Sequence, residues 1–224
     1  MERPQEHSTS VELTQQLIAI LTTEQSTLQS AQGQEIEDIN GRTTLYVGAI
    51  SGALVALALV AQLSRLGTAF FVFSFVLFPS LVFMGIVTFE RTIQSTYAIV
   101  TYARGMSRLR HLYLDNAPQL GPYFILSSRD DSASVTGSLG ITPSRWQIFL
   151  ITPGMIAVIN SVLVGAFAGL LVSAIFALAL PLSASVGVLA FLLSVAIHQR
   201  YHWRYFKGTE QAIPALFPQD QRGA

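Results

Sequence analysis

The chain has 224 residues, of which 51% are hydrophobic and only 12% charged, with 13 basic and 13 acidic residues and no cysteine. A soluble domain carries about a quarter charged residues, so this composition argues against an ordinary soluble domain, and the absence of cysteine excludes disulfides and thiol chemistry. The sequence contains no nucleophile elbow, P-loop, zinc-protease or dinucleotide-binding motif. We therefore expect no enzyme activity, no cofactor and no nucleic-acid partner.

Long uncharged stretches predict membrane spans. Asp, Glu, Lys and Arg are absent from residues 43–64, 66–89 and 146–197. Apolar stretches of about 18 or more residues are typical of transmembrane helices, and the third stretch is long enough for two. The sequence predicts an all-α integral membrane protein with four transmembrane helices, the first two extended by long cytosolic helices. The expected spans are about 44–63, 68–89, 150–173 and 179–198, with Pro181 in the first turn of the fourth.

The positions of the basic residues predict the orientation. Four spans place both ends of the chain and the 90–145 loop on one side of the membrane, and that side holds 12 of the 13 Lys and Arg residues. Cytoplasmic loops carry an excess of Lys and Arg. We expect a multi-pass protein of the plasma (inner) membrane with cytoplasmic N- and C-termini, and Trp146 and the aromatic and basic residues 198–206 as interface anchors.

Five segments follow in chain order. They are an acidic cytosolic helix (1–41), a first transmembrane hairpin (42–89), a cytosolic helix and loop (90–147), a second transmembrane hairpin (148–198) and a cytosolic tail (199–224). Residues 117–147 are rich in Gly, Pro, Ser and Thr, which predicts a loop, with a short strand or a lid around Tyr123 to Leu126 as an open alternative. Asp130 and Asp131 are expected to be loop residues rather than ligands of a divalent ion.

The helical pattern of the second span continues past Glu90 and ends at Pro118. The extensions of the first two spans leave a tight hairpin and should run side by side, with Glu24 near Ser107 and with Glu35, Glu37 and Asp38 near Arg91. We expect opposite charges to set the register of this antiparallel pair; the alternative is that the charges simply face water. The acidic residues concerned are Glu24, Glu35, Glu37 and Asp38, and the basic residues are Arg104, Arg108 and Arg110.

Small residues recur every fourth position in two of the expected spans. In membranes, helices associate by close packing, which small residues on one face permit. We expect the first and third spans to pack through these faces, or one of them to pack on a neighbouring subunit. The residues are Gly48, Gly52 and Ala56 in the first span and Ser161, Gly165, Gly169 and Ser173 in the third.

A few residues of the spans are candidates for a pore or gate. Asn160 is the one amide well inside an apolar span, and it serves either an interhelical hydrogen bond or a polar pore lining. Phe78 and Pro79 in the second span offer an apolar constriction and a kink, or simply packing. Glu90 and Arg91 at the end of this span can select ions or merely mark the membrane boundary.

No Asp, Glu, His, Lys or Arg lies within the membrane core of the expected spans, which argues against an ion-coupled transporter. The leading hypothesis is an oligomeric, passive ion pore or channel controlled through its cytosolic helices. The alternatives are a non-conducting scaffold or signalling partner, and a membrane-disrupting effector of a bacterial defence system. Expected partners are the lipid bilayer, further copies of the chain, and a cytosolic protein or small ligand. No metal is expected, because His198 and His202 lie among interface-anchoring residues without a nearby acid.

Overall fold

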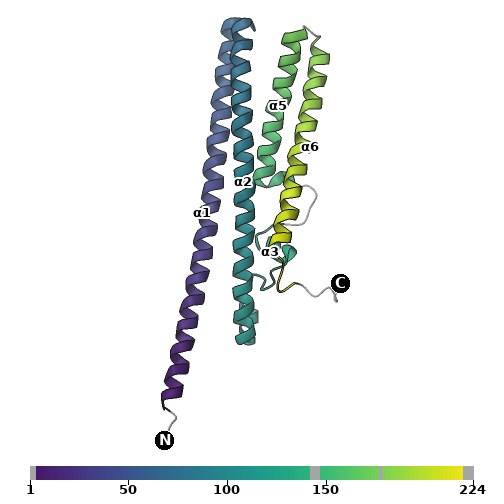
Figure 1. Ribbon diagram of the computed structural model, residues 1–224. Helices are drawn as coiled ribbons and strands as arrows, with labels where there is room; N and C mark the ends of the chain where they lie inside the picture. Colours follow the sequence, from purple (N-terminus) through teal and green to yellow (C-terminus); the bar gives the residue numbers. More distant parts are fainter. Residues whose placement is uncertain (1–3, 142–146, 177–178, 219–224) are drawn as a thin grey trace. The chain divides into compact units, whose positions relative to one another are not determined.

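The computed structural model describes residues 4–141, 147–176 and 179–218, which form helices and turns and no strand. The predicted all-helical class is thus confirmed. Trp146 lies outside the described residues. The four long helices each contain a stretch long and apolar enough to cross a membrane, as predicted, so the chain has the make-up of a multi-pass membrane protein. They are α1 (Pro4–Ser64), α2 (Thr68–Asn116), α5 (Thr152–Phe176) and α6 (Leu180–Ala212) (Figure 1).

Short helices fill much of the connection between α2 and α5. α2 ends at Asn116, just before Pro118, where the sequence predicts it to stop. The 3-10 helix η1 (Pro118–Tyr123) follows, then α3 (Ser132–Ser138) and α4 (Gln147–Leu150). In the described part of this connection no strand forms. Tyr123 is the last residue of η1 and residues 124–126 follow it without strand pairing, so the alternative of a short strand around Tyr123 to Leu126 is not realised.

A tight turn joins α1 to α2, and a proline lies at the start of the last long helix. Between α1 and α2 the backbone turns at Arg65 and Leu66, which adopt left-handed conformations with φ of 50° and 59°, and the Gly67 amide donates to the Ser64 carbonyl. α6 begins at Leu180, so Pro181 lies in its first turn, as the sequence predicts. Proline is tolerated there because the first backbone amides of a helix have no partner within it.

The chain divides into two compact units, each of which is described by itself. The first, called the bundle, contains Glu37–Tyr97 and Ser144–Ala212. The second, called the small unit, contains Met1–Ile36, Ala98–Pro143 and Ile213–Ala224. α1 and α2 each contribute residues to both.

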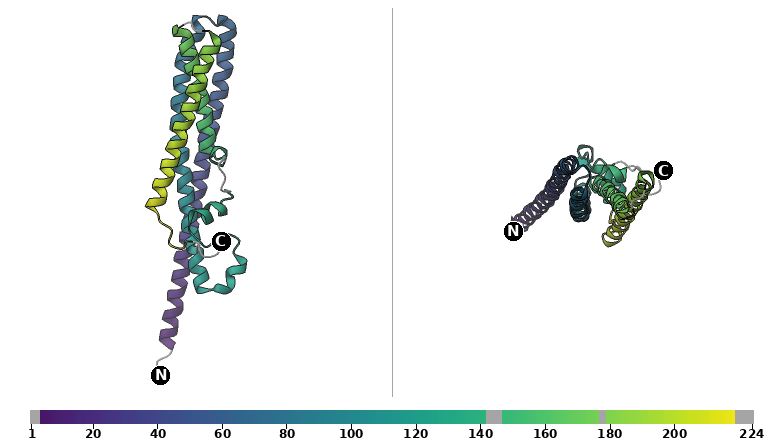
Figure 2. Two further views of the ribbon diagram at one scale, coloured as in Figure 1. Left: turned by 90° about the vertical axis from the view of Figure 1, so that its right-hand side faces the viewer. Right: turned by 90° about the horizontal axis from the view of Figure 1, so that it is seen from above.

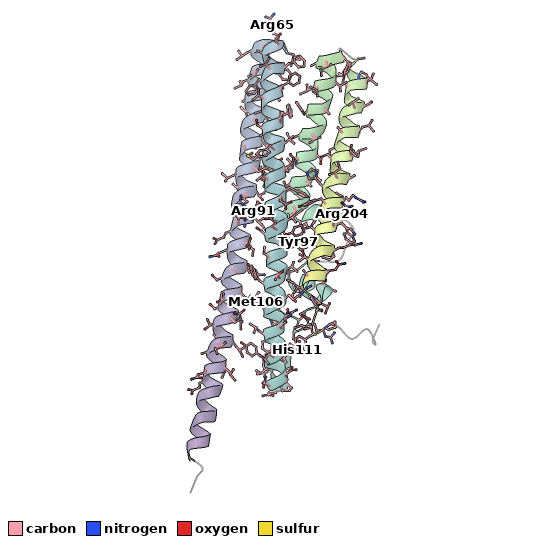
Figure 3. All side chains as sticks on the ribbon, viewed as in Figure 1. Arg65, Arg91, Tyr97, Met106, His111 and Arg204 are labelled. Atoms are coloured by element: carbon pink, nitrogen blue, oxygen red, sulfur yellow. The ribbon has the colours of Figure 1, made fainter. Side chains whose placement is uncertain are left out.

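Aromatic and small side chains hold the bundle together. Phe167 of α5 packs edge-on against Phe75 and stacks on Phe78 of α2, with ring centroids 6.2 and 6.1 Å apart. Tyr97 of α2 stacks on Tyr205 of α6 at 5.1 Å (Figure 3). α5 and α6 lie side by side along their length in the two side views (Figures 1 and 2). These contacts place the middle of α5 against the apolar half of α2.

The small unit has a more polar interior. Leu28 of α1 lies over Gly105 of α2, where an added Cβ would come within 3.1 Å of the leucine. Around this contact Val135 and Ala103 are buried together with the polar residues Ser107 and Asp130. The antiparallel contact of the two helices at Leu28 and Gly105 is displaced by only about two residues from the register expected for Glu24 and Ser107.

Candidate functional site

A buried polar junction joins three helices of the bundle. The hydroxyl of Tyr46 in α1 donates to Oδ1 of Asn160 in α5 at 3.3 Å, and both side chains are fully buried. Gly85 of α2 faces them so closely that an added Cβ would lie 2.6 Å from Cγ of Asn160. Nδ2 of Asn160 has no hydrogen-bond partner. Asn160 thus makes the interhelical hydrogen bond that one reading of the sequence proposed, at a position enclosed within one chain.

The small-residue face of α5 packs on α6. Ser161 donates to Ser194 at 2.9 Å. A Cβ on Gly165 would come within 2.7 Å of the Gly187 carbonyl oxygen, and one on Gly169 within 3.2 Å of the Ser183 carbonyl oxygen. The partner of this face is therefore the fourth candidate span of the same chain, and not the first, as the sequence had suggested. The reason is that α6 offers its own small residues to α5.

An apolar groove of about 560 Å³ opens between α5 and α6. Ser173, the last member of the small-residue series, lines it with Gly165 and Gly169. Ser183 also lines the groove; its side chain is 3% exposed and its hydroxyl has no hydrogen-bond partner. Small residues thus leave space on this side of the hairpin as well as bringing its helices together.

The matching face of α1 has no close neighbour. Gly48 and Gly52 are exposed, and an added Cβ at either would meet nothing within 4 Å. Ala56 is half-buried. Thr44 and Ser51, on the adjoining strip of the helix, are exposed too. This face of α1 is therefore available to a partner.

The remaining pore candidates lie apart. Phe78 is buried against Phe167, whereas Pro79 is exposed within a continuous helix. Glu90 accepts from Gln94 at 2.9 Å, and Arg91 donates to the same glutamine at 2.8 Å. In the bundle, therefore, Glu90 and Arg91 form a short chain of hydrogen bonds on the surface of α2.

The most extensive polar cluster is in the small unit and centres on Asp130, which is fully buried. Its Oδ2 accepts from Nε of Arg108 at 2.7 Å and from the Leu216 amide at 2.9 Å. Its Oδ1 accepts from the Phe217 amide at 2.7 Å. Arg108 also donates to the Pro214 carbonyl oxygen at 2.9 Å. A buried carboxylate thus binds the backbone of residues 86 and 87 positions later in the chain.

Two more residues of α2 complete this cluster. Arg104 donates to the Ile213 carbonyl oxygen and to the Ser132 hydroxyl. The His111 ring stacks on that of Phe217, with centroids 3.9 Å apart and planes inclined by 22°. His111 is labelled at the end of α2 in Figure 3. The last turns of α2 therefore contact residues 213–217 through charge, hydrogen bonds and one aromatic stack.

The surroundings of Asp130 favour its charged form. Burial by itself raises the pKa of the carboxyl, but the amides of Leu216 and Phe217 and the Arg108 guanidinium outweigh this effect and hold the pKa below its ordinary value of 3.8. Hydrogen bonds to a carboxylate stabilise the ionised state. Asp130 is consequently ionised over the whole physiological pH range.

The acidic and basic residues of the two extensions have partners that differ from those expected. Arg108 forms its ion pair with Asp130, not with Glu24, which is exposed. Arg110 donates to the Ser127 carbonyl oxygen at 2.5 Å. Asp38 pairs with Arg42 at 2.7 Å and lies 4.0 Å from Arg91, in line with the expected approach to Arg91. Glu35 is half-buried and Glu37 exposed. Arg108 pairs with Asp130 because this carboxylate is buried beside it, and hydrogen bonds between charged groups are stronger than those between neutral groups.

The remaining acids and histidines do not gather into a metal site. Asp131 caps α3, accepting from the Ser134 amide at 3.0 Å, so it serves a different partner from Asp130. His198 packs edge-on against Phe89, with ring centroids 4.7 Å apart, and His202 is buried beside Tyr97. Within residues 4–141, 147–176 and 179–218, no group of three His, Asp or Glu side chains is placed to hold a metal ion.

Sequence reasoning missed the partners of several of these residues. The Ser183–Gly187 spacing in α6 repeats the small-residue pattern of α5 and is a signal that could have identified its partner. Tyr46 stands out only as the one tyrosine in the first uncharged stretch. No local pattern identifies residues 213–217 as the partner of Asp130, because they contribute mostly backbone groups.

No protein-family model, curated protein or solved structure matches the chain. The function therefore has to be argued from the chemistry and geometry of its own residues.

Proposed function

We propose that the chain is a four-span integral membrane protein with both ends and the small unit on the cytoplasmic side. The four apolar helices support insertion. The concentration of 12 of the 13 basic residues outside the two short turns supports the orientation. The proposed location is the plasma (inner) membrane.

In this membrane the chain forms a homo-oligomer, in which the face of α1 carrying Gly48, Gly52 and Ala56 packs into the α5–α6 groove of a neighbouring copy. Tyr46 and Asn160 touch and so lie at one depth in the bilayer. Gly52 is six residues beyond Tyr46 and Gly165 five beyond Asn160, so at about 1.5 Å rise per residue their depths agree within about 2 Å. A small face and a small-lined groove at equal depth permit the close packing on which helix association in lipid depends.

The function that this arrangement supports best is a passive pore between copies. The single observation that carries it is the exposure of Thr44 and Ser51 beside the small face of α1. The Ser51 hydroxyl donates to the Val47 carbonyl oxygen of its own helix, so its proton is already used while its oxygen stays exposed, and exposed hydroxyl groups of this kind can line a water path. Asn160 and Phe78 are enclosed by one bundle, so the path is proposed between copies and not through a single one.

The test measures ion flux through the purified protein in liposomes together with the oligomer mass of the same sample. The double substitution Gly48→Leu with Gly52→Leu should lower the oligomer mass and abolish flux. The control is Ala58→Leu, which adds bulk at another exposed position of α1 and should change neither. Unchanged mass and flux in the double variant would contradict the proposed interface.

A second candidate function is a non-conducting membrane scaffold or signalling partner. The observation that favours it is the cluster around Asp130, an elaborate polar arrangement in the small unit that a simple pore does not require. Absence of flux from a well-defined oligomer, at several pH values and divalent-ion concentrations, would support the scaffold over the pore.

A further inference from the structure

The cluster around Asp130 has the features of a peptide-binding site. Both oxygens of the carboxylate accept backbone amides, from Leu216 and Phe217. Arg104 and Arg108 donate to the backbone carbonyls of Ile213 and Pro214. The Asp130 amide completes the pattern by donating to the Phe217 carbonyl oxygen at 3.3 Å. The site thus binds two carbonyl groups, at residues 213 and 214, followed by two amides and a carbonyl group at residues 216 and 217, as when a peptide is bound through its backbone.

Side chains contribute to this contact mainly at one position. The Phe217 ring stacks on His111, whereas the Leu216 side chain is 59% exposed and Pro214 is also exposed. The site therefore recognises its ligand through hydrogen bonds to the backbone and through one aromatic ring. Proline fits at positions 214 and 218, where no amide is used, and is excluded at 216 and 217, where the amide donates to Asp130.

Part of the site is formed without the segment that fills it. The ion pair of Asp130 with Arg108 and the hydrogen bond of Arg104 to Ser132 both join residues outside 213–218. The occupying segment contributes little buried apolar surface, which is the property of a region that opens locally at low cost.

From these contacts we propose that Arg104, Arg108, His111 and Asp130 form a binding site for a short peptide with an aromatic residue. Residues 213–218 of the same chain occupy this site as a releasable latch. The proposal does not depend on whether the chain conducts ions. It assigns to the small unit a ligand class, a linear peptide of the pattern Ile-Pro-Ala-Leu-Phe-Pro.

The experiment uses the full chain in detergent and a fluorescent peptide with the sequence of residues 210–218. The receptor is the full-chain double variant Leu216→Pro with Phe217→Ala, which removes one amide donor and the aromatic ring and so empties the site. The peptide should bind this variant at least tenfold more tightly than it binds the wild-type chain, whose site is filled. Adding Asp130→Asn to the variant should abolish binding.

Two peptides that differ from the parent peptide only at Leu216 test how the site recognises its ligand. A peptide with Leu216→Ala keeps the amide and loses only an exposed side chain, so it should bind like the parent peptide. A peptide with Leu216→Pro lacks the amide and should lose binding at least tenfold. Equal affinity of these two peptides would contradict recognition through the backbone.

Every result for the receptor decides the proposal. Equal binding to the variant and to wild type would show that residues 213–218 do not occupy the site, and would overturn the latch. Binding to neither would show that the contact is a fixed part of the fold, and would overturn the peptide site. Helical content and oligomer mass are compared with those of wild type; if the double variant is misfolded, the full chain with Phe217→Ala alone takes its place under the same criteria.

Discussion

Gly85 of α2 faces Asn160 of α5 at a distance that leaves no room for a side chain on the glycine. A Cβ at this position would approach the Asn160 amide and the Tyr46 hydroxyl to below 3.0 Å. The absence of a side chain on α2 is therefore what allows the Tyr46–Asn160 hydrogen bond to form beside it. Three helices meet at one point where only glycine fits.

Gly85→Ala should destabilise the bundle, because the added methyl group must displace a buried tyrosine or amide. Overpacking of this kind costs about 1–3 kcal/mol. The measurement is the thermal midpoint of the purified protein in detergent, which should fall. The control is Gly33→Ala, where a Cβ meets nothing within 4 Å; there the greater helix propensity of alanine, worth about 1 kcal/mol, should leave the midpoint unchanged or raised. A Gly85→Ala protein as stable as wild type would refute the close contact.

The Tyr46–Asn160 hydrogen bond should contribute a measurable coupling energy. Tyr46→Phe removes the donor and leaves the buried Asn160 oxygen without it, so unfolding should become easier by about 0.6–2 kcal/mol. A double-mutant cycle with Asn160→Ala isolates the pairwise energy. We expect a favourable coupling of at least about 0.5 kcal/mol, and strictly additive effects would show that the two side chains do not interact.

Alanine substitutions along α5 should form a graded series. A Cβ at Gly165 would come within 2.7 Å of a backbone oxygen of α6, which cannot move aside, whereas at Gly169 the corresponding distance is 3.2 Å. Gly165→Ala should therefore cost more stability than Gly169→Ala, with about 1–3 kcal/mol for the former. Denaturation of both variants in the same detergent gives the order, and the reverse order would contradict the packing of α5 on α6.

The contact between Asp130 and residues 216–217 should depend on pH in one direction. Because the folded pKa of Asp130 lies below its ordinary value of 3.8, the stabilisation is fully present above that value and is lost as the pH falls through the folded pKa. Hydrogen-exchange protection factors of the Leu216 and Phe217 amides should stay constant from pH 7 to about 5 and fall only at more acidic pH.

Asp130→Asn provides the matching control for this measurement. The asparagine carries no charge for the two amides and Arg108 to bind. The free energy of exchange protection of the Leu216 and Phe217 amides should therefore fall by about 2–3 kcal/mol at neutral pH, and the protection should no longer change when the pH is lowered. Protection that increases on acidification in the wild-type chain would contradict the assignment to an ionised carboxylate.

The helices of this chain could be predicted because their signals are local. The absence of charge over 43–64, 66–89 and 146–197 identified the candidate spans, and Pro118 and Pro181 marked a helix end and a helix start. The spacing of Ser161, Gly165 and Gly169 likewise identified a packing face, since one helix face is defined by its own period.

The partners of these faces could not be predicted in the same way. A glycine is needed at position 85 only because Tyr46 and Asn160, which belong to two other helices, pack against it. The charges of Arg104 and Arg108 suggested acidic partners in the N-terminal helix, but charge alone does not distinguish an exposed glutamate from a buried aspartate. The carbonyl and amide groups of residues 213–217 are present in any sequence, so composition cannot reveal that they bind Arg104, Arg108 and Asp130.

The separation of Asp130 from its backbone partners has a consequence for biosynthesis. Leu216 and Phe217 are added by the ribosome 86 and 87 residues after Asp130. A nascent chain that has not yet reached Phe217 lacks one or both of these amides, so its Asp130 carboxylate has fewer of the hydrogen bonds that it accepts in the folded protein. Closure of this cluster therefore follows the synthesis of residue 217, and a product terminated before that residue is without it.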